Sequence, residues 1–151
     1  MEVYALLLGS TLSAGTVIAL AALGLLINEK AGIVNLGAEG LMLCAALAGF
    51  VAVVHTGNEW IAYGTGALAG AALAAVFGVL VIWLNTNQYA TGLALSLFGV
   101  GFSAFAGLNY VQAKMPELPL DGIPYLRDLS LVGPSLFDHD PMVYGAVLLV
   151  I

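Results

Sequence analysis

The sequence predicts an all-α protein, a polytopic bundle of transmembrane helices with four complete spans and a truncated fifth. Of its 151 residues, 62% are hydrophobic and 8% are charged, whereas soluble domains have about 45–50% apolar and about 25% charged residues. No charged residue lies between Glu2 and Glu29 or between Glu59 and Lys114. Because a helix crosses a hydrocarbon core of about 30 Å with about 20 apolar residues, these two stretches are predicted to hold spanning helices.

The first uncharged stretch has room for one span and the second for two, with the polar residues Asn85–Gln88 as the turn between them. A further span fits between Ile33 and His55. A signal peptide would be a competing interpretation of the first span, but Met1 and Glu2 provide no basic flank and the apolar stretch is too long. The expected helices are Val3–Ile27, Val34–Val54, Trp60–Leu84 and Tyr89–Tyr110.

All five prolines lie between Gln112 and Pro141. Proline lacks a backbone donor and fixes φ, so residues 112–141 are expected to form a proline-rich acidic loop outside the hydrocarbon. The apolar run Met142–Ile151 is too short to cross a bilayer as a helix, and we interpret it as the start of the fifth span. Residues 1–151 are therefore expected to form a single, incomplete transmembrane domain.

Two of the expected helices carry a small residue at every fourth position. Helices in lipid gain no hydrophobic free energy from touching, so small residues that allow close backbone approach favour their association. This spacing predicts tight helix packing. The positions are Gly66, Gly70, Ala74 and Gly78 in the third helix and Gly99, Ser103 and Gly107 in the fourth.

The polar residues with the strongest functional interest lie between Asn28 and Gly40, where glycines loosen the helix between two apolar stretches. One interpretation is structural: Asn35 caps the next helix, and Glu39 in its first turn complements the helix dipole. The other is that this helix starts inside the membrane, where its free N–H groups and Asn35 face a polar solute path. Glu39 would then be an intramembrane acid, which is a functional candidate because it is costly to bury.

Other ligand classes have little support in the sequence. Nine acidic and three basic residues exclude a broad nucleic-acid footprint. His55 and His139 lack metal-ligand spacing, and no Walker A pattern is present. We expect neither a metal nor a cofactor in this chain.

Two stretches carry a family resemblance. Glu29–Met42 (EKAGIVNLGAEGLM) resembles a motif of bacterial ABC transporter permeases of the nucleoside and simple-sugar uptake type, which are related to ribose and branched-chain amino acid permeases. A second match is Asn87–Leu97 (NQYATGLALSL), with Ser96 where asparagine is common and Tyr89 where an aliphatic residue is common. The resemblance covers nearly the whole chain and corresponds to the amino-terminal half of such a permease.

The resemblance implies a transport subunit rather than an enzyme. It implies a path for a small hydrophilic solute, a nucleoside or simple sugar, between this chain and a second permease subunit in a homodimer or heterodimer. A separate ABC ATPase subunit would hydrolyse ATP, and an extracytoplasmic solute-binding lipoprotein would deliver the solute. The implied location is the bacterial cell (inner) membrane, in a multi-pass arrangement within the lipid bilayer.

The candidate pathway residues are polar or glycine positions of the two motifs, and Asn87-Gln88 can also be explained more simply as a turn and helix start. The set is Asn35, Gly37, Glu39, Gly40, Asn87, Gln88 and Ser96. Lys114 and Arg127 in the 112–141 loop favour a cytoplasmic location for it, but the resemblance places this loop outside the cell, and we adopt that orientation as our expectation.

Two alternatives stay open: a fragment of a secondary transporter or channel, and an integral-membrane lipid enzyme. An ion-coupled carrier usually has several ionisable groups in its spans, and a lipid enzyme needs a cluster of acids, bases or metal ligands. Glu39 is the single candidate acid within the expected spans.

Overall fold

The computed structural model describes residues 2–116 and 141–150, and all regular elements within these ranges are helices. The all-α class is therefore confirmed. The chain divides into two compact units, one of Met1–Ile27 with Pro119–Ile151 and one of Asn28–Leu118. Each unit is described separately.

Within the described residues, four helical segments are long and apolar enough to cross a membrane: Gly9–Lys30, Ala38–Thr56, Glu59–Trp83 and Gln88–Tyr110. Many large apolar side chains on them are exposed, including Ile18 at 70% and Phe105 at 76%. Outward apolar side chains are the pattern expected where lipid is the surrounding solvent. The chain is a multi-pass membrane protein, and its four complete spans were predicted correctly.

In the first unit, helix α1 (Glu2–Lys30) extends beyond the expected end at Ile27. Hydroxyl side chains along α1 donate hydrogen bonds to carbonyl oxygens of the preceding turn, as in the 2.8 Å bond from Thr16 Oγ1 to the oxygen of Leu12. Such bonds satisfy hydroxyl groups where water is absent.

Helix α6 (Pro141–Val150) also belongs to the first unit and begins at the last residue of the expected loop. Proline suits this position because the first turn of a helix does not use its N–H group. The rest of the predicted loop falls mainly on 117–140, which lies outside the described residues.

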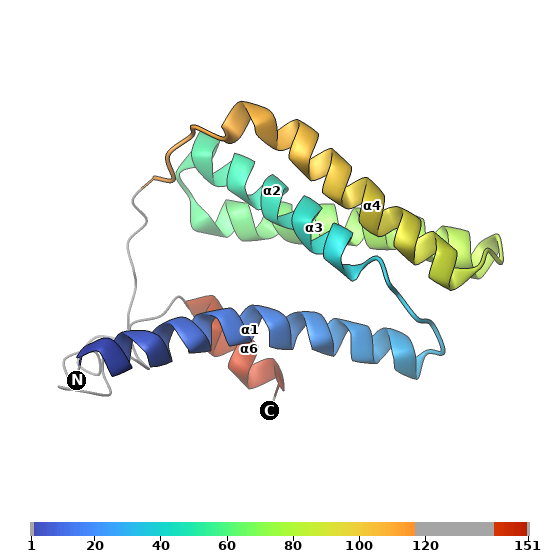
Figure 1. Ribbon diagram of the computed structural model, residues 1–151, viewed down its shortest axis with the longest axis horizontal. Helices are drawn as coiled ribbons and strands as arrows, with labels where there is room; N and C mark the ends of the chain where they lie inside the picture. Colours follow the sequence, from blue (N-terminus) through green and yellow to red (C-terminus); the bar gives the residue numbers. More distant parts are fainter. Residues whose placement is uncertain (1, 117–140, 151) are drawn as a thin grey trace. The chain divides into compact units, whose positions relative to one another are not determined.

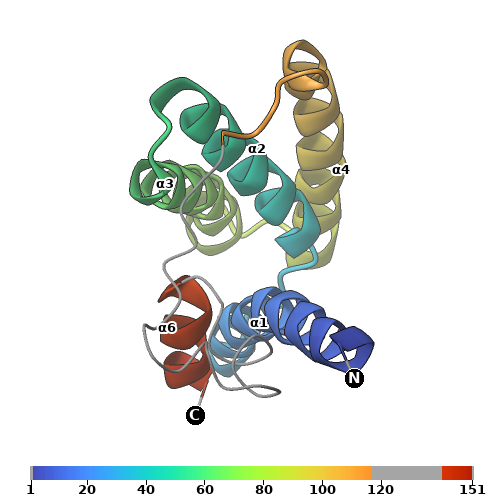
Figure 2. The ribbon, with the colours of Figure 1, turned by 90° about the vertical axis from the view of Figure 1, so that its left-hand side faces the viewer.

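In the second unit, helix α2 (Ala38–Thr56) lies between α3 (Glu59–Gly78) and α4 (Gln88–Gly107), as Figures 1 and 2 show. Helix α2 packs extensively against both neighbours, whereas α3 and α4 contact each other only sparsely. Helix α2 is therefore the central helix of this unit.

The contact between α2 and α3 depends on small residues. A Cβ atom at Gly66 would lie 3.0 Å from the carbonyl oxygen of Ala45, and one at Gly49 would lie 3.1 Å from a carbonyl oxygen of α3. A Cβ at Gly70 would meet Ala45 Cβ at 3.6 Å, but one at Gly78 would meet nothing within 4 Å. The predicted packing ridge is confirmed at Gly66 and Gly70, whereas Gly78 lies beyond the contact between α2 and α3.

The ends of α3 differ in regularity. At the start, Asn58 Oδ1 accepts hydrogen bonds from the N–H groups of Trp60 and Ile61, which is a standard side-chain cap. At the other end, the expected single helix to Leu84 is wrong in detail, because α3 changes into a π-helical turn, η1 (Val79–Trp83). The wider π-helical turn ends the regular α-helical hydrogen bonding of α3 before the polar residues Asn85–Gln88.

In the turn between η1 and α4, Asn85 adopts a positive φ of 50°. Asparagine tolerates this left-handed conformation better than most residues. Thr86 Oγ1 donates back to the oxygen of Leu80 at 2.8 Å. After α4, the 3₁₀ turn η2 (Leu108–Tyr110) completes the fourth span.

The α2–α3 contact predicts a position-dependent effect of bulk in α3. Gly66→Leu should destabilise the protein by about 1–3 kcal/mol, because the side chain would push against the α2 backbone. The measurement is the thermal unfolding midpoint of the purified protein in detergent. Gly64→Leu is the matched control, since a Cβ at Gly64 would meet nothing within 4 Å. Equal losses in both variants would contradict this packing.

Candidate functional site

The non-helical segment before α2 lies against the first half of α4. Helix α1 ends at Lys30 and α2 begins at Ala38, so residues 31–37 (the 31–37 segment) lie between two helices. The expected start of the second helix at Val34 is therefore wrong by four residues. Gly37 is the N-cap residue, and its carbonyl oxygen accepts the N–H of Leu41, while the N–H groups of Val34 and Gly37 bond to side chains.

These two hydrogen bonds hold the 31–37 segment in place. The N–H of Val34 donates to Gln88 Oε1 at 3.0 Å, across 54 positions of sequence. The N–H of Gly37 donates to Asn35 Oδ1 at 2.8 Å, in a buried local turn. Asn35 is only 9% exposed. Both polar side chains thus satisfy backbone groups that would be costly to leave unpaired in an apolar surrounding.

Glycines bring the backbones of α2 and α4 into direct contact. A Cβ at Gly40 would lie 2.6 Å from the oxygen of Leu95 and 2.7 Å from Ser96 Cα, and a Cβ at Gly99 would overlap the backbone of Gly40. Real Cβ atoms do not approach that closely, so neither position has room for a side chain without a shift of one helix. This packing is closer than side chains would allow, and it is the arrangement that small residues permit between membrane helices.

The same close approach continues into the 31–37 segment. A Cβ at Gly92 would lie 2.8 Å from the nitrogen of Leu36, and one at Gly37 would lie 3.0 Å from the oxygen of Gly92. Cys44, one turn beyond Gly40, places its Sγ 3.7 Å from the oxygen of Gly99. The two stretches that carry the family resemblance therefore form one packed site.

Five of the seven candidate residues come together here, and two do not. Asn35, Gly37, Gly40, Gln88 and Ser96 all lie at the contact between α2, α4 and the 31–37 segment. Glu39 and Asn87 are exposed at the first turn of α2 and before the first turn of α4.

The two capping expectations have opposite outcomes. Asn87 Oδ1 accepts from the N–H groups of Tyr89 and Ala90 at 3.0 and 3.2 Å, so its role as a helix start is confirmed. Asn35 as the cap of α2 is wrong, because Gly37 occupies the N-cap position and no side chain caps it. Asn35 instead forms its bond inside the preceding turn. Glu39 does lie in the first turn of α2, as expected.

Sequence reasoning missed Gly92 and the long-range partner of Gln88. The available signal for Gly92 was the series Gly92, Ser96 and Gly99, whose spacings of four and three place small residues on one face of the fourth helix. The bond between Gln88 and Val34 had no such local signal, because its partners are far apart in the sequence.

Two of the recesses in the second unit differ in the ligand chemistry that they would suit. A polar one of about 350 Å³ at the turn before α4 includes Gln88, so the site reaches accessible space there. Its lining residues are Val81, Asn85, Thr86, Asn87, Gln88 and Tyr89.

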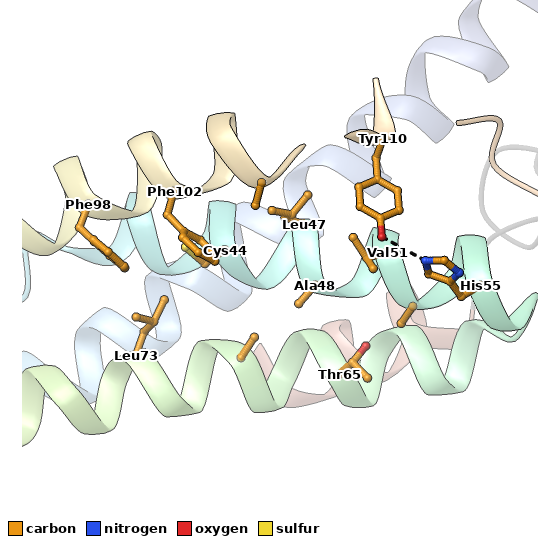
Figure 3. Close-up of a pocket in the computed structure, with 13 residues that line it drawn as sticks. Cys44, Leu47, Ala48, Val51, His55, Thr65, Leu73, Phe98, Phe102 and Tyr110 are labelled. Carbon is orange, nitrogen blue, oxygen red and sulfur yellow. Dashed lines mark hydrogen bonds between the residues drawn. The ribbon is translucent and has the colours of Figure 1, made fainter. Parts of the chain in front are cut away.

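The second recess is an apolar groove of about 600 Å³ between α3 and α4, with α2 as its floor (Figure 3). Phe98, Phe102 and Leu73 line its sides, and His55 Nε2 and the Tyr110 hydroxyl share a 3.0 Å hydrogen bond at one end. Its chemistry suits apolar contact rather than a hydrophilic solute. Among the described residues, no three His, Cys, Asp or Glu side chains are grouped to hold a metal; His139 lies outside them.

The fold and the site together define a polytopic helical membrane protein with a non-helical, glycine-packed segment between spans. The family model for the permease component of branched-chain amino acid transport systems matches residues 7–117. The chain therefore belongs to this permease family.

Individual relatives are named as ABC transporter permeases. A Haloferax volcanii protein with the provisional name of a glucose ABC transporter permease, TsgC13, is 44% identical over 99% of this chain and 47% of its own length. The guanosine ABC transporter permease NupQ of Bacillus subtilis is 26% identical over 98% of this chain and 49% of its own length.

The nucleoside ABC transporter permease NupC of Lactococcus lactis is 25% identical over 76% of this chain and 39% of its own length. The chain thus spans about half the length of the first two relatives and less of the third. No solved structure matches the chain significantly.

The α2–α4 contact predicts that adding one methyl group has different effects on stability at two nearby glycines of α4. Gly99→Ala should lower the unfolding free energy by about 1–3 kcal/mol, because the added Cβ collides with the Gly40 backbone. Gly101→Ala should be neutral or slightly stabilising, since nothing lies within 4 Å of a Cβ there and alanine favours a helix over glycine. Thermal unfolding of the two purified variants checks this, and a milder effect at Gly99 than at Gly101 would contradict it.

Proposed function

We propose that the chain is part of the membrane-spanning permease subunit of an ABC importer, which forms the translocation path for a sugar or nucleoside. The observation that carries this proposal is the packed site in which Asn35 and Gln88 hold the non-helical 31–37 segment against α4. Irregular backbone at membrane depth is tolerated where it is buried in protein or lines an aqueous cavity. Transporters use such interrupted helices to bind polar solutes.

The choice of solute class rests on the relatives. Their names specify glucose, guanosine and nucleosides, all of which are polar molecules rich in hydroxyl groups. The weakly polar character of the site fits a path that a solute traverses, because a separate binding protein can provide capture specificity. A path of this kind needs few charged residues in the spans.

The proposed assembly contains a second permease subunit, as a homodimer or heterodimer, and ABC ATPase subunits that hydrolyse ATP in separate chains. An extracytoplasmic solute-binding lipoprotein would deliver the solute. We place the assembly in the bacterial cell membrane, with the 112–141 loop outside and Asn85–Gln88 inside. Alternating access would come from ATP-driven motion of the ATPase subunits, and the candidate residues of both motifs would line the path.

The complete transporter is expected to take up labelled glucose or guanosine in an ATP-dependent manner. The measurement is uptake into cells that carry the full-length permease, its ATPase and its binding protein. Deletion of the ATPase gene should reduce uptake to background, because ATP hydrolysis in that separate subunit drives the proposed transport cycle. Uptake that continues undiminished without the ATPase would support an ion-coupled carrier or a channel instead.

Glu39 is expected to affect transport beyond any effect on its helix. Glu39→Gln should reduce uptake at least about fivefold while leaving membrane insertion intact, if the carboxylate borders the path. Glu59→Gln is the control, because Glu59 is likewise an acidic residue in a first helical turn, that of α3. Both variants lose a similar favourable interaction with the helix dipole. Equal uptake by the two variants would leave Glu39 with only a helix-stabilising role.

A further inference from the structure

The two carboxamide side chains of the site have a fixed orientation. Oδ1 of Asn35 accepts the N–H of Gly37, and Oε1 of Gln88 accepts the N–H of Val34. A flipped amide would direct its NH₂ group at another N–H donor, which cannot form a hydrogen bond. The backbone partners therefore determine which end of each amide faces the 31–37 segment.

The NH₂ ends of both amides are left available. Within the described residues, neither Asn35 Nδ2 nor Gln88 Nε2 has a hydrogen-bond partner, and no buried side-chain nitrogen or oxygen lacks one. Both nitrogens must therefore reach accessible space. For Gln88 that space includes the polar recess before α4. For Asn35 the accessible nitrogen belongs to a side chain that is otherwise almost fully buried.

We infer that the site recognises its solute through hydrogen-bond donors, Nδ2 of Asn35 and Nε2 of Gln88. The class of ligand that fits is a neutral molecule with several acceptor atoms, such as hydroxyl, carbonyl or ring oxygens. This inference rests on the proposed transport function and specifies the polarity of its recognition.

The test replaces each donor while keeping the acceptor. Asn35→Asp and Gln88→Glu have nearly the same shape and retain an oxygen for Gly37 or Val34, but they have no NH₂ group. Uptake of labelled glucose and guanosine is measured in liposomes that contain the complete transporter. Each site variant is expected to raise the solute concentration for half-maximal uptake about tenfold, the effect of losing one hydrogen bond and leaving its partner unpaired.

Asn58→Asp is the matched control. Asn58 is also an asparagine whose oxygen accepts backbone N–H groups, but it caps α3 and is exposed. The same chemical change there should leave the half-maximal concentration unchanged. The thermal unfolding midpoint of each variant checks that the fold is retained.

Unchanged half-maximal concentrations in Asn35→Asp and Gln88→Glu would overturn the inference while leaving the proposed function intact. An equal loss in Asn58→Asp would also overturn it, since charge alone would then explain the effect. If the wild-type transporter takes up neither probe in the presence of ATP, the proposed sugar or nucleoside transport fails, and the inference fails with it.

Discussion

The second unit depends on the approach of two helix backbones that only glycine allows. At Gly40 and Gly99, α2 and α4 come so close that a methyl group on either residue would overlap the opposite backbone. In lipid, such contact provides van der Waals attraction that hydrophobic burial cannot supply. Gly92 extends the same contact to the backbone of Leu36, so the position of the 31–37 segment follows from the way α2 and α4 pack.

The interruption before α2 leaves backbone N–H groups without helical partners, and two polar side chains accept hydrogen bonds from them. A segment that leaves helical geometry between apolar spans has N–H groups without helical partners. Gln88 and Asn35 accept two of them. The polar residues of the two motifs therefore stabilise the interruption itself, and the same amides keep their donor groups accessible. Structural and functional interpretations of these residues are compatible, because each amide has an oxygen that accepts a backbone N–H and an NH₂ group that can donate to a solute.

The sequence predicted those features that depend on local composition and spacing. Four spans followed from apolar length, and Asn87 was correctly expected to start a helix because its bonds reach only two and three residues ahead. The start of α2 was missed, because Val34 lies in an apolar context and its decisive partner, Gln88, is remote in the chain. Gly78 was expected to pack like Gly66, but periodicity cannot show where along α3 the contact ends.

The central claim is that Gln88 holds the 31–37 segment by accepting the N–H of Val34. Amide hydrogen exchange at Val34, resolved to the single residue in the membrane-reconstituted full-length permease, tests it most directly. Slow exchange in the wild type, accelerated at least about tenfold in Gln88→Met but unchanged at Leu41 inside α2, is the predicted result. Exchange at Val34 that is fast in the wild type, or equally slow in both proteins, would contradict the account.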